Sequence, residues 1–91
     1  MPRKPDLPPL NLVNDETIGQ RLARLRKKKK MTQQELAEKI GVQRYLIANY
    51  EQGRTRIYDE MLIRLALELD CTVDYLVGFK QRNEPDFLFK K

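Results

Sequence analysis

Apolar residues recur at helical spacing through most of the chain, and no segment shows the alternation that a half-buried strand requires. Ile18, Leu22 and Leu25 follow one another in steps of four and three, which predicts one apolar stripe on a helix of about 14 residues. Asn14 or Asp15 can cap this helix, because either side chain can accept a hydrogen bond from a free backbone amide. Basic residues fill the rest of its surface.

Two short helices joined by a tight glycine turn are predicted next. Thr32 and Glu35 have the spacing of a capping box at the start of the first, and Gly41 supplies the left-handed residue that ends it. The second helix spans residues 43–51. Because only Val42 separates the turn from this second helix, the two helices must cross at a steep angle.

Two more helices complete the predicted core. The first spans residues 57–69, and its buried side consists of Met61, Leu62, Leu65, Ala66 and Leu69. Thr72 caps a last short helix at residues 73–77, which Gly78 ends. The sequence therefore predicts an all-α fold class, a compact domain of five helices.

The two ends of the chain lack this periodicity. Residues 1–14 hold four of the five prolines. Proline removes backbone donors and disfavours helix in the residue before it, so we expect an arm that is extended or disordered. Residues 79–91 contain aromatic side chains without a clear period, and Pro85 interrupts them. The predicted organisation is an arm (1–14), a folded domain (15–78) and a short tail (79–91).

Composition narrows the classes of function. A chain of 91 residues suits one domain, and none of its apolar runs approaches the roughly 18 residues that span a bilayer. A single Cys cannot form an internal disulfide, so the cytoplasm is the expected compartment. The chain has no His, no phosphate-cradling glycine loop and no identifiable pair of catalytic carboxylates. We therefore expect neither an enzyme nor a bound metal or other cofactor.

Charge is distributed unevenly along the chain. Between residues 21 and 56 there are eleven basic residues and three acidic ones, whereas residues 57–78 contain five acidic residues and one basic one. The overall charge of +5 favours a polyanionic partner. The first of these two segments is the part expected to face that partner.

The central segment contains a motif that is typical of a known protein family. Residues 33–52, QQELAEKIGVQRYLIANYEQ, resemble the helix-turn-helix of the lambda-repressor-like or Cro-type (xenobiotic-response-element) transcriptional regulators. The motif core positions are Leu36, Ala37, Ile40, Gly41, Val42, Ile47 and Tyr50. Both flanks fit the same pattern, so the resemblance extends over residues 15–78. It implies double-stranded DNA as the partner.

Residues 43–51 form the expected recognition helix, because Ile47 and Tyr50 turn inward and leave the other face for base edges. The expected base contacts are Gln43, Arg44, Tyr45 and Asn49. Arg44 can donate a bidentate pair to guanine, and Asn49 can pair in the same way with adenine. The expected phosphate contacts are Thr32, Gln33, Gly53, Arg54, Arg56, Lys29 and Lys30. The lysines can touch a phosphate or only raise the local potential.

The resemblance also implies an ion pair between Arg26 and Glu51, which would orient Arg26 beside the DNA backbone. If partly buried, this pair would matter more for stability than an exposed one, which is typically worth about 0 to 1 kcal/mol.

Four residues depart from the usual pattern of the family or need separate interpretation. Lys30 stands where Gly commonly ends the first helix, and Gln43 replaces the usual Ser or Thr cap. Leu46 is apolar at a position that is frequently polar, so it either packs toward the fourth helix or lies near a thymine methyl group. Cys71 is expected to be a buried structural thiol.

The function expected from these features is that of a sequence-specific DNA-binding transcriptional regulator, a repressor that binds a palindromic operator as a homodimer. The last two helices or the tail would supply the dimer contact. The alternative is an antitoxin or adaptor that regulates its own operon and binds a protein partner through its arm or tail. Binding to a membrane surface through the lysine run would require the first helix to expose its apolar stripe.

Overall fold

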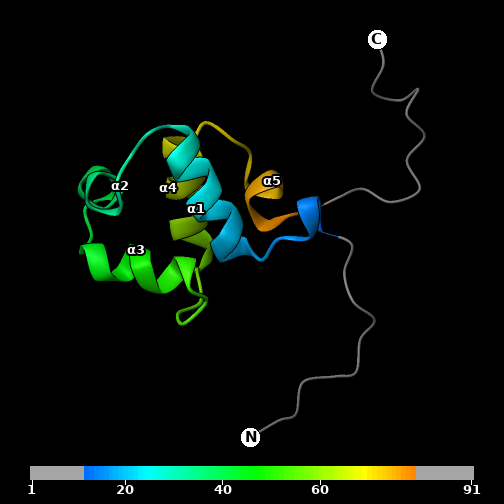
Figure 1. The fold of residues 1–91 in the computed structure, drawn as a ribbon, viewed down its shortest axis with the longest axis horizontal. Helices are drawn as coiled ribbons and strands as arrows, with labels where there is room; N and C mark the ends of the chain where they lie inside the picture. The colour runs from blue at the N-terminus through cyan, green and yellow to red at the C-terminus, as the bar shows by residue number, and fades with distance from the viewer. Residues whose placement is uncertain (1–11, 80–91) are drawn as a thin grey trace, which may run out of the picture.

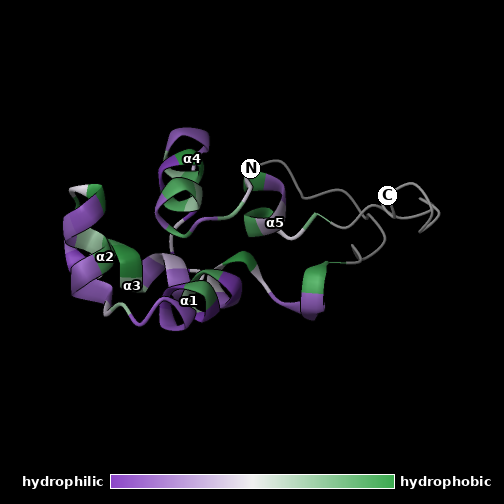
Figure 2. Cartoon of the chain, turned by 90° about the horizontal axis from the view of Figure 1, so that it is seen from above, coloured by the Kyte–Doolittle hydropathy of each residue, from purple (hydrophilic) through white to green (hydrophobic). Residues whose placement is uncertain are grey.

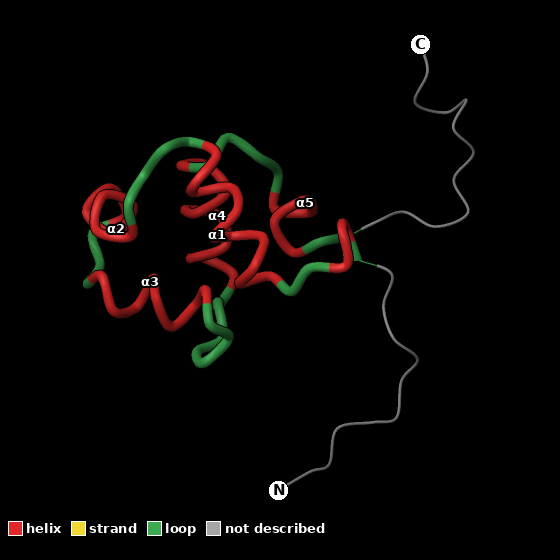
Figure 3. The backbone as a smooth tube through the Cα atoms, in the orientation of Figure 1, coloured by secondary structure: helices red, strands yellow, loops and turns green. Residues whose placement is uncertain are grey.

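The computed structural model describes residues 12–79, so most of the predicted arm and tail lies outside the described residues. Within them the chain forms one 3-10 turn, η1 (Val13–Asp15), and five α-helices, α1 (Ile18–Lys28), α2 (Gln33–Ile40), α3 (Arg44–Glu51), α4 (Asp59–Glu68) and α5 (Val73–Val77). Figure 1 shows their arrangement, and Figure 3 shows only helix and loop in this range. The predicted all-α fold of five helices is confirmed.

The start of α1 differs from the prediction. Thr17, not Asn14 or Asp15, is its N-cap: the Thr17 hydroxyl accepts from the Gln20 amide at 3.1 Å, and the Gln20 side chain accepts from the Thr17 amide at 3.0 Å. Asn14 and Asp15 have φ values of 54° and 52° in η1. This backbone conformation is incompatible with an N-cap, whose φ and ψ lie in the β region. Helix α1 therefore begins later than predicted, at Ile18, and has 11 residues.

The other predicted helix ends follow the capping chemistry of the sequence. Thr32 and Glu35 form a reciprocal capping box at α2, and Gly41 ends α2 with a φ of 91°. The Thr72 hydroxyl accepts from the Tyr75 amide at the start of α5. Gln43 precedes α3 without a side-chain cap bond, as expected from the missing Ser or Thr.

One apolar core joins all five helices. It consists of the buried side chains of Leu22, Leu25, Leu36, Ala37, Ile47, Tyr50, Ile57, Leu65, Ala66, Leu69 and Leu76. Helix α1 packs against α3 and α5, and α2 packs against α3 and α4. Helix α4 begins two residues later than predicted, yet Ile57 is still buried in the loop before it. Met61 and Leu62 are half-buried at the edge of the core rather than inside it.

The two ends of the described range meet. The Val13 amide donates to the Gly78 carbonyl at 3.1 Å, so η1 pairs with the residue that follows α5. Residues 12–14 are therefore part of the folded domain, which begins before the boundary predicted at residue 15. In Figure 1, η1 lies beside α5 and away from α2 and α3.

Lys30 ends the turn after α1 in a conformation suited to glycine. Its φ is 59°, in the left-handed region that costs an L-residue roughly 1–2 kcal/mol. We expect Lys30→Gly to raise the free energy of unfolding by about 0.5–1 kcal/mol, measured by urea denaturation. The matched control is Lys27→Gly, at an exposed position within the last turn of α1, which should lower it by up to about 1 kcal/mol. Equal destabilisation by both variants would contradict this account.

Candidate nucleic-acid interface

Helices α2 and α3 form the unit on which the predicted DNA-reading residues lie. Figure 1 shows α2 nearly end-on and α3 lengthwise, so the two cross steeply, as the single-residue spacing after Gly41 requires. Leu36 and Ala37 of α2 and Ile47 of α3 are fully buried. These contacts fix which face of α3 remains exposed.

The predicted base contacts lie toward the amino end of α3 and on its outward side. Gln43, Arg44 and Tyr45 are exposed, and Tyr45 retains 64 % of its accessible surface. Asn49, one turn later, is half-buried. Leu46 is half-buried and packs against the core, which favours the packed position of the two considered for it.

The predicted Arg26–Glu51 ion pair is present between α1 and α3. Arg26 Nε donates to Glu51 Oε2 at 2.7 Å and Arg26 Nη2 donates to Glu51 Oε1 at 3.1 Å. The two side chains keep only 9 % and 8 % of their exposed surface. Arg26 Nη1 also donates to the carbonyl of Met31 at 2.7 Å, which ties the pair to the loop before α2.

A hydrogen-bonded chain connects this pair to a predicted base contact. Gln33 Nε2 donates to Glu51 Oε1 at 2.9 Å, and Gln33 Oε1 accepts from Arg44 Nη1 at 3.2 Å. One amide side chain at the start of α2 thus links the ion pair to the exposed face of α3. The family resemblance implied the Arg26–Glu51 pair but neither of these two further contacts.

The predicted phosphate contacts fall into two groups. Gln33 and Thr32 lie at the start of α2, where the Thr32 hydroxyl accepts from the Glu35 amide at 3.0 Å. Gly53, Arg54 and Arg56 are exposed in the loop after α3, and Lys30 is exposed after α1. Gly53 has a φ of 74°.

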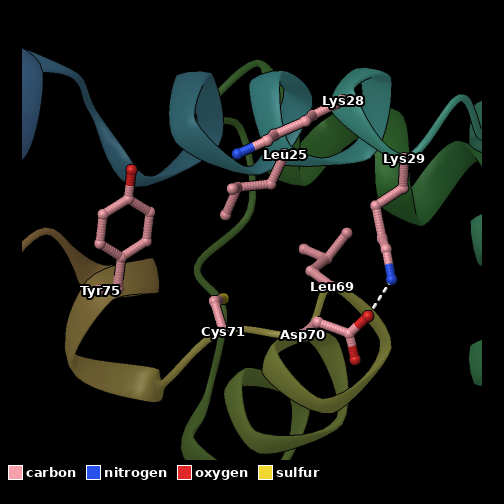
Figure 4. Close-up of a pocket in the computed structure, with 7 residues that line it drawn as sticks. All are labelled: Leu25, Lys28, Lys29, Leu69, Asp70, Cys71 and Tyr75. Atoms are coloured by element: carbon pink, nitrogen blue, oxygen red, sulfur yellow. Dashed lines mark hydrogen bonds and ion pairs between the residues drawn. The ribbon is translucent and has the colours of Figure 1, made fainter.

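Lys29 is separated from the other predicted phosphate contacts. Its Nζ forms an ion pair with the carboxylate of Asp70, which precedes α5 (Figure 4). The two residues border a surface pocket of about 360 Å³, which is also lined by Leu25, Lys28, Leu69, Cys71 and Tyr75. Lys29 thus faces an acid on the α4–α5 side of the domain rather than the α2–α3 unit.

Cys71 lines this pocket and is half-buried, not buried as the sequence suggested. Burial, with a smaller contribution from the nearby Asp70 carboxylate, raises the pKa of the Cys71 thiol. A raised pKa keeps the thiol protonated and unreactive near neutral pH. Within residues 12–79, no group of His, Cys, Asp and Glu is arranged to hold a metal ion.

Arg21 has a structural role that the sequence pattern did not predict, since the basic residues of α1 were expected on its solvated surface. It is fully buried, and its guanidinium donates to the carbonyls of Leu76, Val13 and Glu16 at 3.0, 2.9 and 2.9 Å. Arg21 follows Ile18 by three residues and precedes Leu25 by four, so it lies on the apolar stripe. That spacing was the available signal for its burial.

A second polar cluster holds α5 against α1. Arg24 Nε donates to Glu16 Oε2 at 2.7 Å, and Arg24 Nη2 donates to the Tyr75 hydroxyl at 2.8 Å. The hydrogen bond from Arg24 lowers the pKa of the Glu16 carboxyl and raises the pKa of the Arg24 guanidinium. These contacts belong to the face away from α3 and are assigned a structural role.

Comparison with known proteins places this geometry among DNA-binding proteins. A family model described as a helix-turn-helix domain matches residues 19–78. Repressor protein C2 of Salmonella phage P22 is 32 % identical over 82 residues, covering 80 % of this chain and 38 % of the repressor. The chain spans between 38 % and 66 % of the length of the curated relatives it matches.

Solved structures agree with that comparison. The P22 c2 repressor in complex with a synthetic operator has a TM-score of 0.67 and 32 % identity, covering 71 % of this chain and 98 % of that chain. The master regulator for biofilm formation SinR, in complex with DNA, has a TM-score of 0.62 and 34 % identity, covering 66 % of this chain and 97 % of that chain. No helix in residues 12–79 is long and apolar enough to cross a membrane.

Proposed function

Because the chain belongs to the helix-turn-helix family of lambda-repressor-like transcriptional regulators, we propose that it is a repressor that binds a specific DNA operator. The observation that carries this proposal is the chain Arg26–Glu51–Gln33–Arg44. It runs from a buried ion pair to an exposed guanidinium at the amino end of α3. A base-reading side chain is useful only if its support is rigid, and this network provides such a support.

In this proposal α3 enters the major groove and Gln43, Arg44, Tyr45 and Asn49 face the base edges. Arg44 suits guanine, which offers two acceptors in the major groove, and Asn49 suits adenine. Gln33 can grip a phosphate beside the free amides at the start of α2 while it still holds Arg44 in place. Its two hydrogen bonds would couple phosphate binding to base reading.

The remaining phosphate contacts are proposed from their exposure at the start of α2, in the loop after α3 and after α1. They are Thr32, Gly53, Arg54, Arg56 and Lys30. Lys29 stands apart from this set, because its ammonium group pairs with Asp70 on the α4–α5 side of the domain. The phosphate contacts would position the protein on the duplex, while the α3 residues would select the sequence.

We propose further that the protein acts as a homodimer on a palindrome. One recognition helix reads only about 4 to 5 base pairs, and two helices about 34 Å apart would read successive major grooves. Repression would follow from occlusion of a promoter, without a chemical step. The alternative, an antitoxin or adaptor, depends on the arm and the tail. Residues 1–11 and 80–91 of these segments lie outside the described residues.

The experiment that tests the proposal is in vitro selection of bound duplexes from a random library with the purified full chain. The expected result is a single enriched motif with two inverted half-sites, whose centres lie about 10 base pairs apart. Enrichment of a single half-site would refute binding as a dimer, but it would still support sequence-specific DNA binding. Recovery of duplexes that share no sequence motif would refute sequence-specific binding.

Arg44 provides the residue-level test. We expect Arg44→Ala to weaken binding to the selected operator by about 1–3 kcal/mol and to relax the preference at one base pair, because a bidentate contact is lost. Fluorescence anisotropy with the operator and with single-base variants measures both effects.

The matched control is Arg54→Ala, in the exposed loop after α3. It should weaken binding to every duplex by a similar factor and lower the salt dependence of the affinity. An unchanged base preference in the Arg44→Ala variant would show that α3 is docked incorrectly in this proposal.

A further inference from the structure

Helix α4 has two large aliphatic side chains on its outer face. Ile63 and Leu67 keep 52 % and 72 % of their accessible surface, and they are four residues apart, so they lie side by side on the helix. The buried residues Leu65 and Ala66 occupy the side of α4 that faces the core. Figure 2 shows α4 on the opposite side of the domain from α1, and in Figure 1 it lies behind α1.

The residues that flank this aliphatic pair are polar but carry no net charge. Glu60 and Arg64 lie beside it, and Arg64 Nε and Nη2 both donate to Glu60 Oε2, at 3.0 and 2.9 Å. This surface is called the α4 face (Glu60, Ile63, Arg64 and Leu67). Because its two charges neutralise each other, a second α4 face can approach it without charge repulsion. An apolar centre with a polar rim is the usual anatomy of a protein interface.

The other exposed large apolar side chains belong to different parts of the fold. Within residues 12–79 they are Tyr45, Tyr58 and Phe79. Tyr45 is a proposed base contact on α3, Tyr58 precedes α4, and Phe79 follows α5. Ile63 and Leu67 are thus the two of this set that share one helix face. In the described range, the α4 face is therefore the apolar surface that best suits a protein partner.

The proposed homodimer needs a surface that can contact itself. In a twofold dimer the same patch lies on both subunits, so every contact between unlike residues occurs twice. Ile63 and Leu67 are separated by about 6 Å along the axis of α4. Two antiparallel α4 helices can therefore place Ile63 of one copy against Leu67 of the other, and the reverse contact follows by symmetry.

We infer, on the basis of the proposed homodimer, that the α4 face is the contact between two copies of this chain. The α4 face has only four residues, whereas a standard interface uses roughly 20–30 residues from each partner. The contact is therefore weak in free solution. It is strengthened on an operator, because adjacent half-sites raise the local concentration of one chain near the other. The same contact makes binding to the two half-sites cooperative.

The first test is made without DNA, so its result does not depend on the proposed operator. Labelled and unlabelled full chains are mixed at millimolar concentration, and isotope-filtered nuclear Overhauser effects are recorded. Effects are expected between the methyl groups of Ile63 in one copy and Leu67 in the other. Leu67→Gln should abolish the dimer contact. Phe79→Gln should preserve it, since Phe79 is also exposed, at 54 %, but lies off the α4 face.

Two results of this first test would overturn the inference. One is the absence of effects between copies in the wild-type chain, which would leave the DNA-binding proposal intact. The other is a set of effects that connects these methyl groups to any segment other than α4, which would assign the surface to a different occupant.

The second test measures cooperativity on the operator recovered by selection. The wild-type chain should bind the second half-site more tightly than the first. Leu67→Gln should lower this cooperativity about tenfold, because each of the two copies loses an apolar contact. Its affinity for a duplex with one half-site should be unchanged, since Leu67 belongs to α4 and not to the α2–α3 unit. Phe79→Gln should change neither quantity.

The outcomes of the second test separate the interface from the function. Unchanged cooperativity in the Leu67→Gln variant would overturn the α4 contact and leave the repressor proposal standing. Weaker binding of this variant to the single half-site would place Leu67 at the DNA and would also overturn the α4 contact. If selection recovers no paired half-sites, the proposed dimer on a palindrome fails, and the test without DNA still decides whether α4 faces meet.

Discussion

Arg26→Met is expected to lower the free energy of unfolding by about 3 kcal/mol, since it leaves the carboxylate of Glu51 buried without its cation. Glu51→Met should cost about the same, because it strands the Arg26 guanidinium and the Nε2 donor of Gln33. The double variant should lose little more than either single one, since it removes both charges together. Urea denaturation of the four proteins measures the coupling free energy.

The exposed pair Glu60–Arg64 on α4 is the matched control for this cycle. Its side chains keep 77 % and 56 % of their surface, so removal of either should change stability by less than about 0.5 kcal/mol. Additive losses for Arg26 and Glu51 would show that the buried pair contributes no coupling. A charge swap is a poorer test, because Arg at position 51 could not accept the hydrogen bond from Gln33.

Arg21→Met should be about as damaging, with an expected loss of about 3–4 kcal/mol. The substitution keeps much of the buried volume but leaves three carbonyls, those of Leu76, Val13 and Glu16, without their charged donor. These carbonyls belong to α5, to η1 and to the residue before the N-cap of α1, so the loss should appear first where the two ends meet. Hydrogen exchange should accelerate in α5 and η1 before it accelerates in α2 and α3.

Arg24→Met is the control for Arg21. The Arg24 side chain is 35 % exposed and contacts Glu16 and the Tyr75 hydroxyl, so its loss should cost no more than about 1 kcal/mol. Equal destabilisation by the two substitutions would show that the three carbonyls do not depend on Arg21. Arg21→Lys should rescue little, because one ammonium cannot span the positions of three carbonyls.

The sequence predicted those parts of the fold whose cause is local. The capping box at Thr32, the left-handed Gly41 and the cap at Thr72 each depend on residues three or four apart, and each is present. The N-cap of α1 is the exception, because its signal is local and was overlooked: Thr17 and Gln20 have the spacing of a capping box. The bond between Val13 and Gly78 is a distant contact, which no local pattern records.

The candidate site shows the same division between local and distant causes. The family resemblance implied the Arg26–Glu51 pair, and the two side chains form an ion pair in the structure. The bonds that Gln33 makes to Glu51 and to Arg44 arise from the crossing of α2 and α3, so residue types alone could not specify them. Lys29 was also predicted as a phosphate contact, and its pairing with Asp70 is a further distant contact that the run of lysines does not reveal.

The hydrogen bond between Val13 and Gly78 makes the described domain almost a closed ring of chain. A short peptide linker could join residues 12 and 79 covalently, and the ring could then be opened elsewhere. The amides of Gly53 and Arg54 bond to the carbonyls of Tyr50 and Asn49, so residues 55–56, further along the loop after α3, are the better new termini for such a circular permutant. The permuted domain should retain its helices, while its new ends would emerge beside the proposed DNA interface, where a fused segment would reach toward a bound duplex.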